Sequence, residues 1–181
     1  MILSDKEIMA AVHAGSLSIS PFSEGQVQSA GFDFTIGNTF AQLAARENEY
    51  IQPGTMPKYK MLTQNRYLLD PGEYILVSTA EYFRFPDDLA ALITLRNTYI
   101  RLGLFSQNAG CVSPGFEGRI TIALCNMGKA GIVIESGACL GQLLFMRTAV
   151  PAAAPYRGRY QGQDGVSGSG ADAEQLASDD A

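Results

Sequence analysis

Short runs of apolar residues recur along most of the chain, and turn-forming residues separate them. The runs span residues 75–77, 89–95, 120–124, 132–134 and 140–146. The turn signals between them are Pro71-Gly72, Pro86-Asp87-Asp88, Asn126, Gly128 and Gly137. Short apolar runs bounded by glycine and proline are typical of β-strands. So many short strands predict an all-β fold, either a barrel or a jelly-roll sandwich.

One helix is expected before the strands begin. Ser4 followed by Glu7 is a capping-box pattern, and Gly15 offers a stop. Ile8 and Val12 lie four positions apart, so they share one apolar side of this short N-terminal helix.

Two stretches lack a clear apolar pattern. Residues 46–65 are polar and weakly patterned, which predicts a long loop or arm. From Asp164 onward the chain consists mostly of Gly, Ser, Ala and Asp. Such a segment cannot bury enough apolar surface to offset the entropy of ordering, so we expect it to be mobile unless a ligand or partner holds it. The predicted organisation is one domain over residues 1–163 and a flexible tail over residues 164–181.

Composition narrows the classes of partner. The chain has 181 residues, which suits one domain, and a formal net charge of −5. This charge gives no general signal for nucleic acid or an acidic membrane, although a small basic pocket for one triphosphate is compatible with it. The start of the chain lacks a signal-peptide pattern, and no run approaches the roughly 18 apolar residues of a membrane span. We therefore expect a cytoplasmic protein.

The cysteines and the single histidine argue against several common sites. Cys111, Cys125 and Cys139 form no CxxC pair, and His13 lies far from them, which predicts buried thiols in a reducing compartment. Zinc-dependent nucleobase deaminases need H-x-E with P-C-x-x-C, and the chain contains neither, so no zinc is expected. Walker, dinucleotide-binding and G-x-S-x-G motifs are also absent from the sequence. We interpret His13 as a solvent-facing residue of the first helix.

Four segments, in order along the chain, resemble the dCTP deaminase/dUTPase family. The first is 1–5 with 21–22, 27–28 and 32–34; the second runs from Leu69 to Ala90 and contains PGE and PDDLA. The third is RNTYIRLGL (96–104) with GCVSPGFEGRITIALCN (110–126), and the fourth is 141–143 with 155–156 and 159–163. Together they cover roughly residues 1 to 165. Each motif is weak alone, but the ordered set is specific.

This resemblance implies a distorted jelly-roll or β-barrel of the dUTPase type. It also implies a homotrimer whose three active sites are shared between neighbouring subunits, with the C-terminal tail closing over a bound triphosphate. The partner is then a nucleoside triphosphate, with a pyrimidine deoxynucleotide favoured. Magnesium accompanies the phosphates, and the base is deaminated or the phosphate chain hydrolysed without zinc.

Arg96, Asn97 and Thr98 are candidate phosphate-binding residues because they follow an apolar strand. A guanidinium fork beside short donors suits phosphate oxygens geometrically. The residues alone allow a surface ion pair equally well, and the resemblance favours phosphate contact for Arg96. Arg101 is interpreted instead as a structural or inter-subunit residue.

Two further segments supply candidate ligand contacts. At the start of the tail, a cation, a hydroxyl and an amide are available in Arg159, Tyr160 and Gln163; the alternative is an ordinary polar terminus. Residues 109–118 contain three glycines and Pro114, so the backbone can approach a base or sugar closely. The base- or sugar-binding candidates there are Ala109, Gly110, Val112 and Phe116. Phe116 is alternatively a core aromatic.

The chain departs from the family at the positions that carry its chemistry. The family pattern after the PGF turn is I-T-L-E-L-x-N, whose glutamate is the proton carrier, and here the position is Ala123. The family pattern I-D-P-G has an aspartate that holds the sugar or activates water, and here it is Ser113. The family's paired serines align with Asn97 and Thr98. Glu117 is a weak candidate to replace the missing carboxylate.

The sequence thus predicts a nucleotide-binding protein of the dCTP deaminase type whose nominal reaction, hydrolytic deamination of dCTP to dUTP, lacks its general base. The alternatives are a diverged nucleotide hydrolase or deaminase with a changed substrate or reaction, and a catalytically inactive nucleotide sensor or sponge. The sequence does not identify which base and which sugar the protein prefers.

Overall fold

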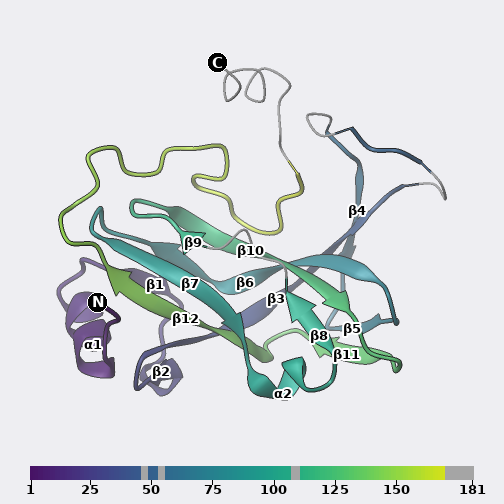
Figure 1. The fold of residues 1–181 in the computed structure, drawn as a ribbon, viewed down its shortest axis with the longest axis horizontal. Coiled ribbons are helices and arrows are strands. Elements are labelled where there is room, and N and C mark those ends of the chain that lie inside the picture. The colour runs from purple at the N-terminus through teal and green to yellow at the C-terminus, as the bar shows by residue number, and fades with distance from the viewer. Residues whose placement is uncertain (46–48, 53–55, 107–110, 170–181) are drawn as a thin grey trace.

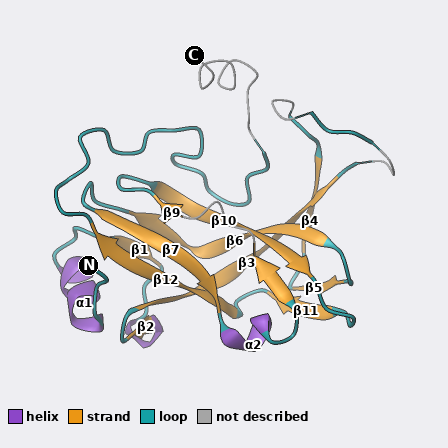
Figure 2. Ribbon diagram, viewed as in Figure 1, coloured by secondary structure: helices purple, strands orange, loops and turns teal. Residues whose placement is uncertain are grey.

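The computed structural model describes residues 1–45, 49–52, 56–106 and 111–169. Strands dominate these residues, and the helical elements are α1 (Asp5–His13), α2 (Asn97–Ile100) and a 3-10 turn at Glu24–Gln26 (Figure 2). The strands are β1 (Ser18–Ser20), β2 (Val27–Gln28), β3 (Gly31–Leu43), β4 (Tyr59–Thr63), β5 (Arg66–Leu69), β6 (Tyr74–Arg84), β7 (Leu89–Leu95), β8 (Leu104–Ser106), β9 (Cys111–Val112), β10 (Glu117–Asn126), β11 (Ile132–Glu135) and β12 (Cys139–Arg147).

Most strands belong to one ten-stranded antiparallel sheet. Its order is β8-β10-β6-β3-β12-β7-β9, with β1 also paired to β6, and β2 and β4 paired to β3. Strands β5 and β11 form a separate two-stranded sheet. Figure 1 shows the large sheet curling on itself, with α1 at one end and α2 at the lower edge. The prediction of an all-β, barrel-like fold with a short N-terminal helix is confirmed.

The apolar runs of the sequence all became strands, but the polar stretch 46–65 contains one as well. Strand β4 lies inside it and pairs with β3 from Thr39 opposite Thr63 to Leu43 opposite Tyr59. The expectation of a loop across this whole stretch was therefore wrong at 59–63. Residues of β4 are exposed or only half-buried, so burial imposes no alternating apolar pattern; backbone pairing with the long β3 defines the strand instead.

Helix α1 forms as the sequence predicts. The backbone N–H and the hydroxyl of Ser4 both donate to Glu7 Oε2 at 2.9 Å. Ile8 is fully buried, Val12 packs against the core, and Gly15 ends the helix with a φ of 71°. His13 is exposed at the last turn.

The core combines aromatic packing with a carboxylate that is almost fully buried. Phe85 packs between Phe145 and Phe116, with ring centroids 5.7 Å and 6.4 Å away. Glu81 is only 1% exposed, and it accepts hydrogen bonds from the Thr35 backbone N–H at 3.0 Å and the Gln26 amide at 2.8 Å. This carboxylate connects β6 to β3 beside the irregular stretch of their pairing.

The chain beyond β12 runs back over the sheet. Figure 1 shows the segment that follows β12 along the upper edge, on the side opposite α2. Residues 164–169 of the predicted tail contact the sheet, whereas residues 170–181 lie outside the described part of the chain. The division at residue 163 stays a prediction. Among the described residues, none of the helices is long and apolar enough to cross a membrane.

Candidate functional site

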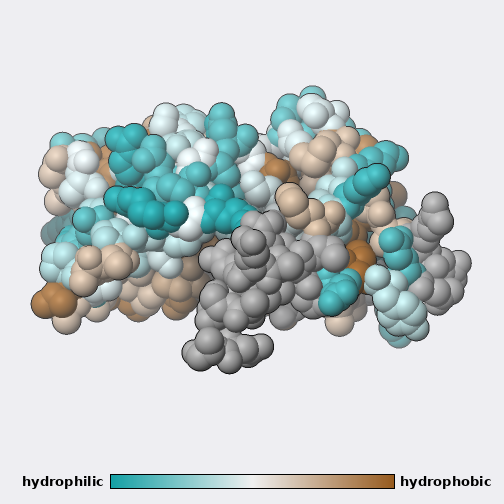
Figure 3. Space-filling model, turned by 90° about the horizontal axis from the view of Figure 1, so that it is seen from above, coloured by the Kyte–Doolittle hydropathy of each residue, from teal (hydrophilic) through white to brown (hydrophobic). Residues whose placement is uncertain are grey.

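A cavity of about 560 Å³ opens between the sheet and the segment that follows β12. Strands β4, β6, β7, β9 and β10 contribute to its lining, together with Ser113, Phe116 and parts of 156–169. Seen from above, this side of the molecule mixes hydrophilic and apolar residues (Figure 3). A cavity of this size is large enough for a small organic ligand.

Strand β10 brings two side chains to the cavity by simple alternation. Ile122 and Leu124 are fully buried in the core, so Thr121 and Ala123 point to the other side of the strand. Both line the cavity, and Ala123 lies opposite Leu76 of β6. The position where the family resemblance expects a glutamate is therefore part of the cavity surface.

The loop before β10 supplies one wall of the cavity. Val112 pairs with Ala91 of β7, and Ser113 follows it at the cavity edge. Phe116 is 7% exposed and packs against Tyr156, with ring centroids 6.0 Å apart. Phe116 thus belongs to the core and also lines the cavity. Two further candidates, Ala109 and Gly110, lie outside the described residues.

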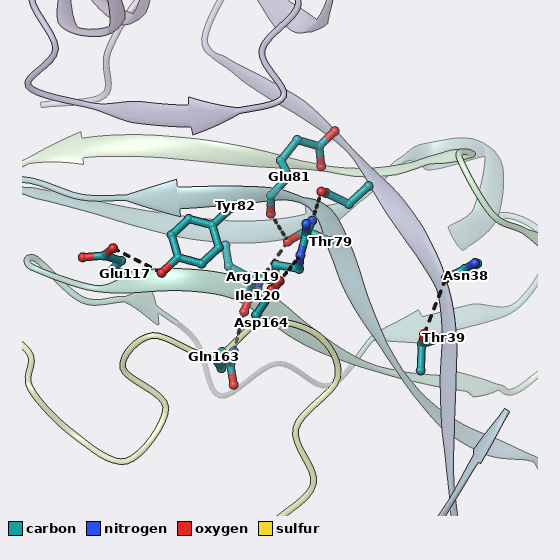
Figure 4. Close-up of polar contacts among 11 residues, drawn as sticks. Asn38, Thr39, Thr79, Glu81, Tyr82, Glu117, Arg119, Ile120, Gln163 and Asp164 are labelled. Carbon is teal, nitrogen blue, oxygen red and sulfur yellow. Dashed lines mark hydrogen bonds and ion pairs between the residues drawn. The ribbon is translucent and has the colours of Figure 1, made fainter. Parts of the chain in front are cut away.

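The predicted tail hinge pairs with β10. Gln163 forms a parallel bridge with Gly118, and Asp164 forms an ion pair with Arg119, whose Nε lies 2.7 Å from Oδ1 (Figure 4). The Gln163 amide N–H donates to the Arg119 carbonyl, whereas its Oε1 is buried and meets no hydrogen-bond donor among the residues that the structure describes. Gln163 and Tyr160 line the cavity, while Arg159 lies outside its lining and is exposed.

The next residues of the tail continue across the cavity. The Ser167 N–H donates to Thr121 Oγ1 at 3.0 Å, and the Ser169 N–H donates to the Tyr59 hydroxyl at 3.2 Å. Between them, Gly168 lies against the Tyr59 ring. The tail is therefore connected to both β10 and β4.

The structure separates Glu117 from the cavity. Its carboxylate accepts a hydrogen bond from Arg84 at 2.9 Å. It accepts a second one from the Tyr82 hydroxyl at 3.2 Å (Figure 4). The bond from Arg84 lowers the pKa of Glu117, which favours the charged form. Two other carboxylates also lie outside the cavity lining: Glu135 pairs with Arg66, and Asp33 pairs with Arg96.

Arg96 lies at the N-terminal end of α2, outside the cavity lining of its own chain. Its Nη1 is 3.3 Å from Asp33 Oδ2 and 3.2 Å from Cys139 Sγ, and its side chain is 49% exposed. Gln142 donates to the other oxygen of Asp33 at 3.2 Å. The neighbouring candidates Asn97, Thr98 and Arg101 are exposed on α2 and its end. Within one chain, candidate ligand-binding residues of β10 and the tail therefore lie together at the cavity. The candidate phosphate-binding residues of α2 lie outside it.

The cavity lining is aromatic and rich in hydroxyl groups. Among the described residues that line it, none is a carboxylate, an imidazole, a lysine or an arginine. Its polar side chains carry one thiol, from Cys111, one amide, from Gln163, and several hydroxyls. The hydroxyls belong to Tyr59, Tyr74, Ser113, Thr121, Tyr156, Tyr160, Ser167 and Ser169. The expectation of buried thiols was wrong. Cys111 is exposed at the cavity because β9 is a short strand at the sheet edge, and Cys125 and Cys139 are only half-buried.

Sequence reasoning missed the tyrosines of β4 and β6. Tyr59 lies in the stretch interpreted as a loop, and Tyr74 begins a long strand, so neither belonged to a motif with a chemical signature. Tyr156 was part of a family motif, but without an assigned role. Only strand pairing brings these side chains together with Ala123.

An antiparallel curled sheet with an open, hydroxyl-rich cavity defines a β-barrel-like protein with a small-molecule site. A family model described as dCTP deaminase-like matches residues 2–148. The chain is 36% identical over 180 residues to a dUMP-forming dCTP deaminase of Clavibacter michiganensis, covering 93% of this chain and 90% of that protein. The protein therefore belongs to the dCTP deaminase-like family.

Solved structures show the same fold. A dCTP deaminase from Agrobacterium tumefaciens superposes with a TM-score of 0.64 at 21% identity, over 81% of this chain and 48% of that one. A mutant dUTPase of Staphylococcus bacteriophage 80alpha, crystallised with dUpNHpp, gives a TM-score of 0.50 at 15% identity, over 79% of this chain and 97% of that one. The prediction of a dUTPase-type fold is confirmed.

Proposed function

We propose that the protein binds a deoxynucleoside triphosphate, with a pyrimidine base favoured, and does not carry out the standard deamination of dCTP. Membership of the dCTP deaminase-like family supports a nucleotide ligand. The observation that carries the second half of the proposal is Ala123 on the surface of the cavity.

Hydrolytic deamination of cytosine needs an activated water and a proton for the leaving nitrogen. A buried carboxylate with a raised pKa can perform both tasks. The methyl group of Ala123 transfers no protons, and Ser113 is a poor general base. Burial raises the pKa of Tyr74, so this phenol stays protonated near neutral pH and does not replace the carboxylate as a base.

The polar side chains of the cavity fit a magnesium ion that is bound to the nucleotide and not to a protein site of its own. Among the described residues, no group of three or more His, Cys, Asp or Glu side chains could hold a metal ion. The Ser113 and Thr121 hydroxyls can donate hydrogen bonds to phosphates, and the amide oxygen of Gln163 can accept one from water around such an ion. Magnesium would neutralise part of the triphosphate charge, and the chain's own residues would orient the nucleotide.

A homotrimer would complete the site. Arg96, Asn97 and Thr98 are exposed on the end of the molecule away from the cavity, so a neighbouring copy would present them to the phosphates. Asp33 and Cys139 hold the guanidinium of Arg96 in place. Arg159, Tyr160 and Gln163 would contact the triphosphate from the tail side.

Incubation with magnesium and each common nucleoside triphosphate, followed by chromatography with mass detection, tests this proposal. We expect every nucleotide to be recovered unchanged and one to be retained on a protein of trimeric mass. Formation of dUTP, dUMP or another product would overturn the non-catalytic part and favour a diverged deaminase or hydrolase. Arg96→Ala should weaken triphosphate binding much more than nucleoside binding; an equal loss contradicts the phosphate contact.

A further inference from the structure

Strand register places two tyrosines beside the position of the missing carboxylate. In one row across the sheet, Ala123 of β10 lies opposite Leu76 of β6, and Leu76 lies opposite Ala41 of β3. Two residues further along these strands, Cys125 of β10 lies opposite Tyr74 of β6. Leu43 of β3 lies opposite Tyr59 of β4. Residues directly opposite in an antiparallel sheet share a face, as do residues two positions apart.

Tyr74 is consequently the diagonal cross-strand neighbour of Ala123. Diagonal neighbours are within reach of an aromatic side chain. Tyr74, Tyr59 and Ala123 all line the cavity, and Tyr74 is 43% exposed there. Because Ala123 ends at its methyl group, the Tyr74 phenol borders the space that a glutamate side chain would occupy.

We infer that Tyr74, backed by Tyr59, contacts the base of the bound nucleotide and makes the site select a 4-oxo pyrimidine over a 4-amino pyrimidine. The inference rests on the proposed nucleotide binding and adds the residues and the class of base.

Hydrogen-bonding chemistry supports this choice of base. A carboxylate only accepts hydrogen bonds, which suits the amino group of a cytosine-type ring. A protonated phenol donates to a carbonyl oxygen, which suits the 4-oxo group of a uracil- or thymine-type ring. Burial and the nearby Tyr59 and Cys125 groups raise the pKa of Tyr74, which keeps its proton in place. The apolar side chains of Ala123 and Leu76 supply no acceptor for an amino group at this position, so only the phenol oxygen of Tyr74 replaces the two acceptor oxygens of the carboxylate.

Tyr59 forms a fixed aromatic wall on the β4 side of the cavity. Its hydroxyl accepts a hydrogen bond from the Ser169 N–H, and its ring lies against Gly168. An aromatic ring held in this way provides a surface on which a planar base can stack.

Isothermal titration of the full chain with dUTP, dTTP and dCTP, each with magnesium, tests the inference. We expect the two 4-oxo nucleotides to bind about tenfold more tightly than dCTP, as one additional hydrogen bond allows. Tyr74→Phe should weaken dUTP binding about tenfold, leave dCTP binding unchanged and so remove the preference. Tyr59→Leu should weaken all three nucleotides. Tyr50→Phe, at a residue 98% exposed and outside the cavity, is the matched control.

Two outcomes separate this inference from the proposed function. Binding of nucleotides with dCTP equal or preferred, or a Tyr74→Phe variant that is folded and keeps the preference, overturns the inference and leaves nucleotide binding intact. Absence of binding by all three nucleotides overturns the proposed function and the inference together. Circular dichroism and size-exclusion mass of each variant establish that it is folded.

Discussion

Gly168 of the tail lies so close to Tyr59 of β4 that a Cβ added to it would be 2.3 Å from Tyr59 Cε2. Real Cβ atoms do not approach a ring carbon this closely. The contact joins the tail to the β4 arm at the cavity, and it explains why a glycine is required at this point of the tail.

Gly168→Ala should displace the tail from Tyr59, because either the ring or the tail backbone has to shift. We expect faster hydrogen exchange at the Ser167 and Ser169 amides and easier proteolysis within residues 164–169. Hydrogen–deuterium exchange with mass spectrometry measures the first effect, and limited proteolysis measures the second. Gly25→Ala is the control, since the nearest atom to an added Cβ there is Ser23 Oγ at 3.7 Å. Unchanged exchange in the Gly168 variant contradicts the contact.

Glu81→Ala should lower the free energy of unfolding by about 2–4 kcal/mol. The substitution leaves the Thr35 N–H and hydroxyl without their acceptor and removes one of the two acceptors of the Gln26 amide, which keeps its bond to the Asp33 carbonyl. Urea unfolding followed by circular dichroism measures the loss. Glu135→Ala, which breaks an exposed ion pair with Arg66, should cost less than about 1 kcal/mol. Equal losses of unfolding free energy in the two variants would show that the hydrogen bonds of Glu81 do not stabilise the fold.

The capping box of α1 should titrate at low pH. Hydrogen bonds from the Ser4 backbone and hydroxyl hold the pKa of Glu7 below its ordinary value of 4.5. A carboxyl with a depressed pKa stabilises the fold above its unfolded-state pKa, and this stabilisation is lost as the pH falls through the folded-state value. NMR titration should give a midpoint below 4.5 for Glu7 and a higher one in Ser4→Ala. The same midpoint in both proteins contradicts the capping box.

Restoring both carboxylates should restore the family reaction. We expect Ser113→Asp combined with Ala123→Glu to convert dCTP to dUTP, since the pair supplies a proton carrier and a sugar-side acid within one cavity. Ala123→Glu alone should bind dCTP more tightly relative to dUTP, because it removes the apolar surface beside Tyr74. Chromatography with mass detection follows the product. A folded, trimeric and inert double variant would show that further residues of the site have diverged.

Local patterns of the sequence were sufficient for much of the fold. The Ser4–Glu7 capping box and the stop at Gly15 predicted α1 because both act over a few residues. The apolar run from Leu89 to Leu95 predicted β7 with the bounds that the structure has. Strand β4 was missed because its exposed positions carry no apolar alternation, and its pairing partner lies about 20 residues earlier in the chain.

By itself, the sequence determined the class of fold, the family and the chemical identity of position 123. Tertiary structure alone decided what surrounds that position. Tyr59 and Tyr74 reach Ala123 through the register of β4, β3, β6 and β10, and hydrogen bonds between distant strands set that register. The tail reaches the cavity through Ser167 and Thr121, which are 46 residues apart. Such long-range pairings leave no periodic trace in the amino-acid sequence, because they depend on how the sheet closes and not on neighbouring residues.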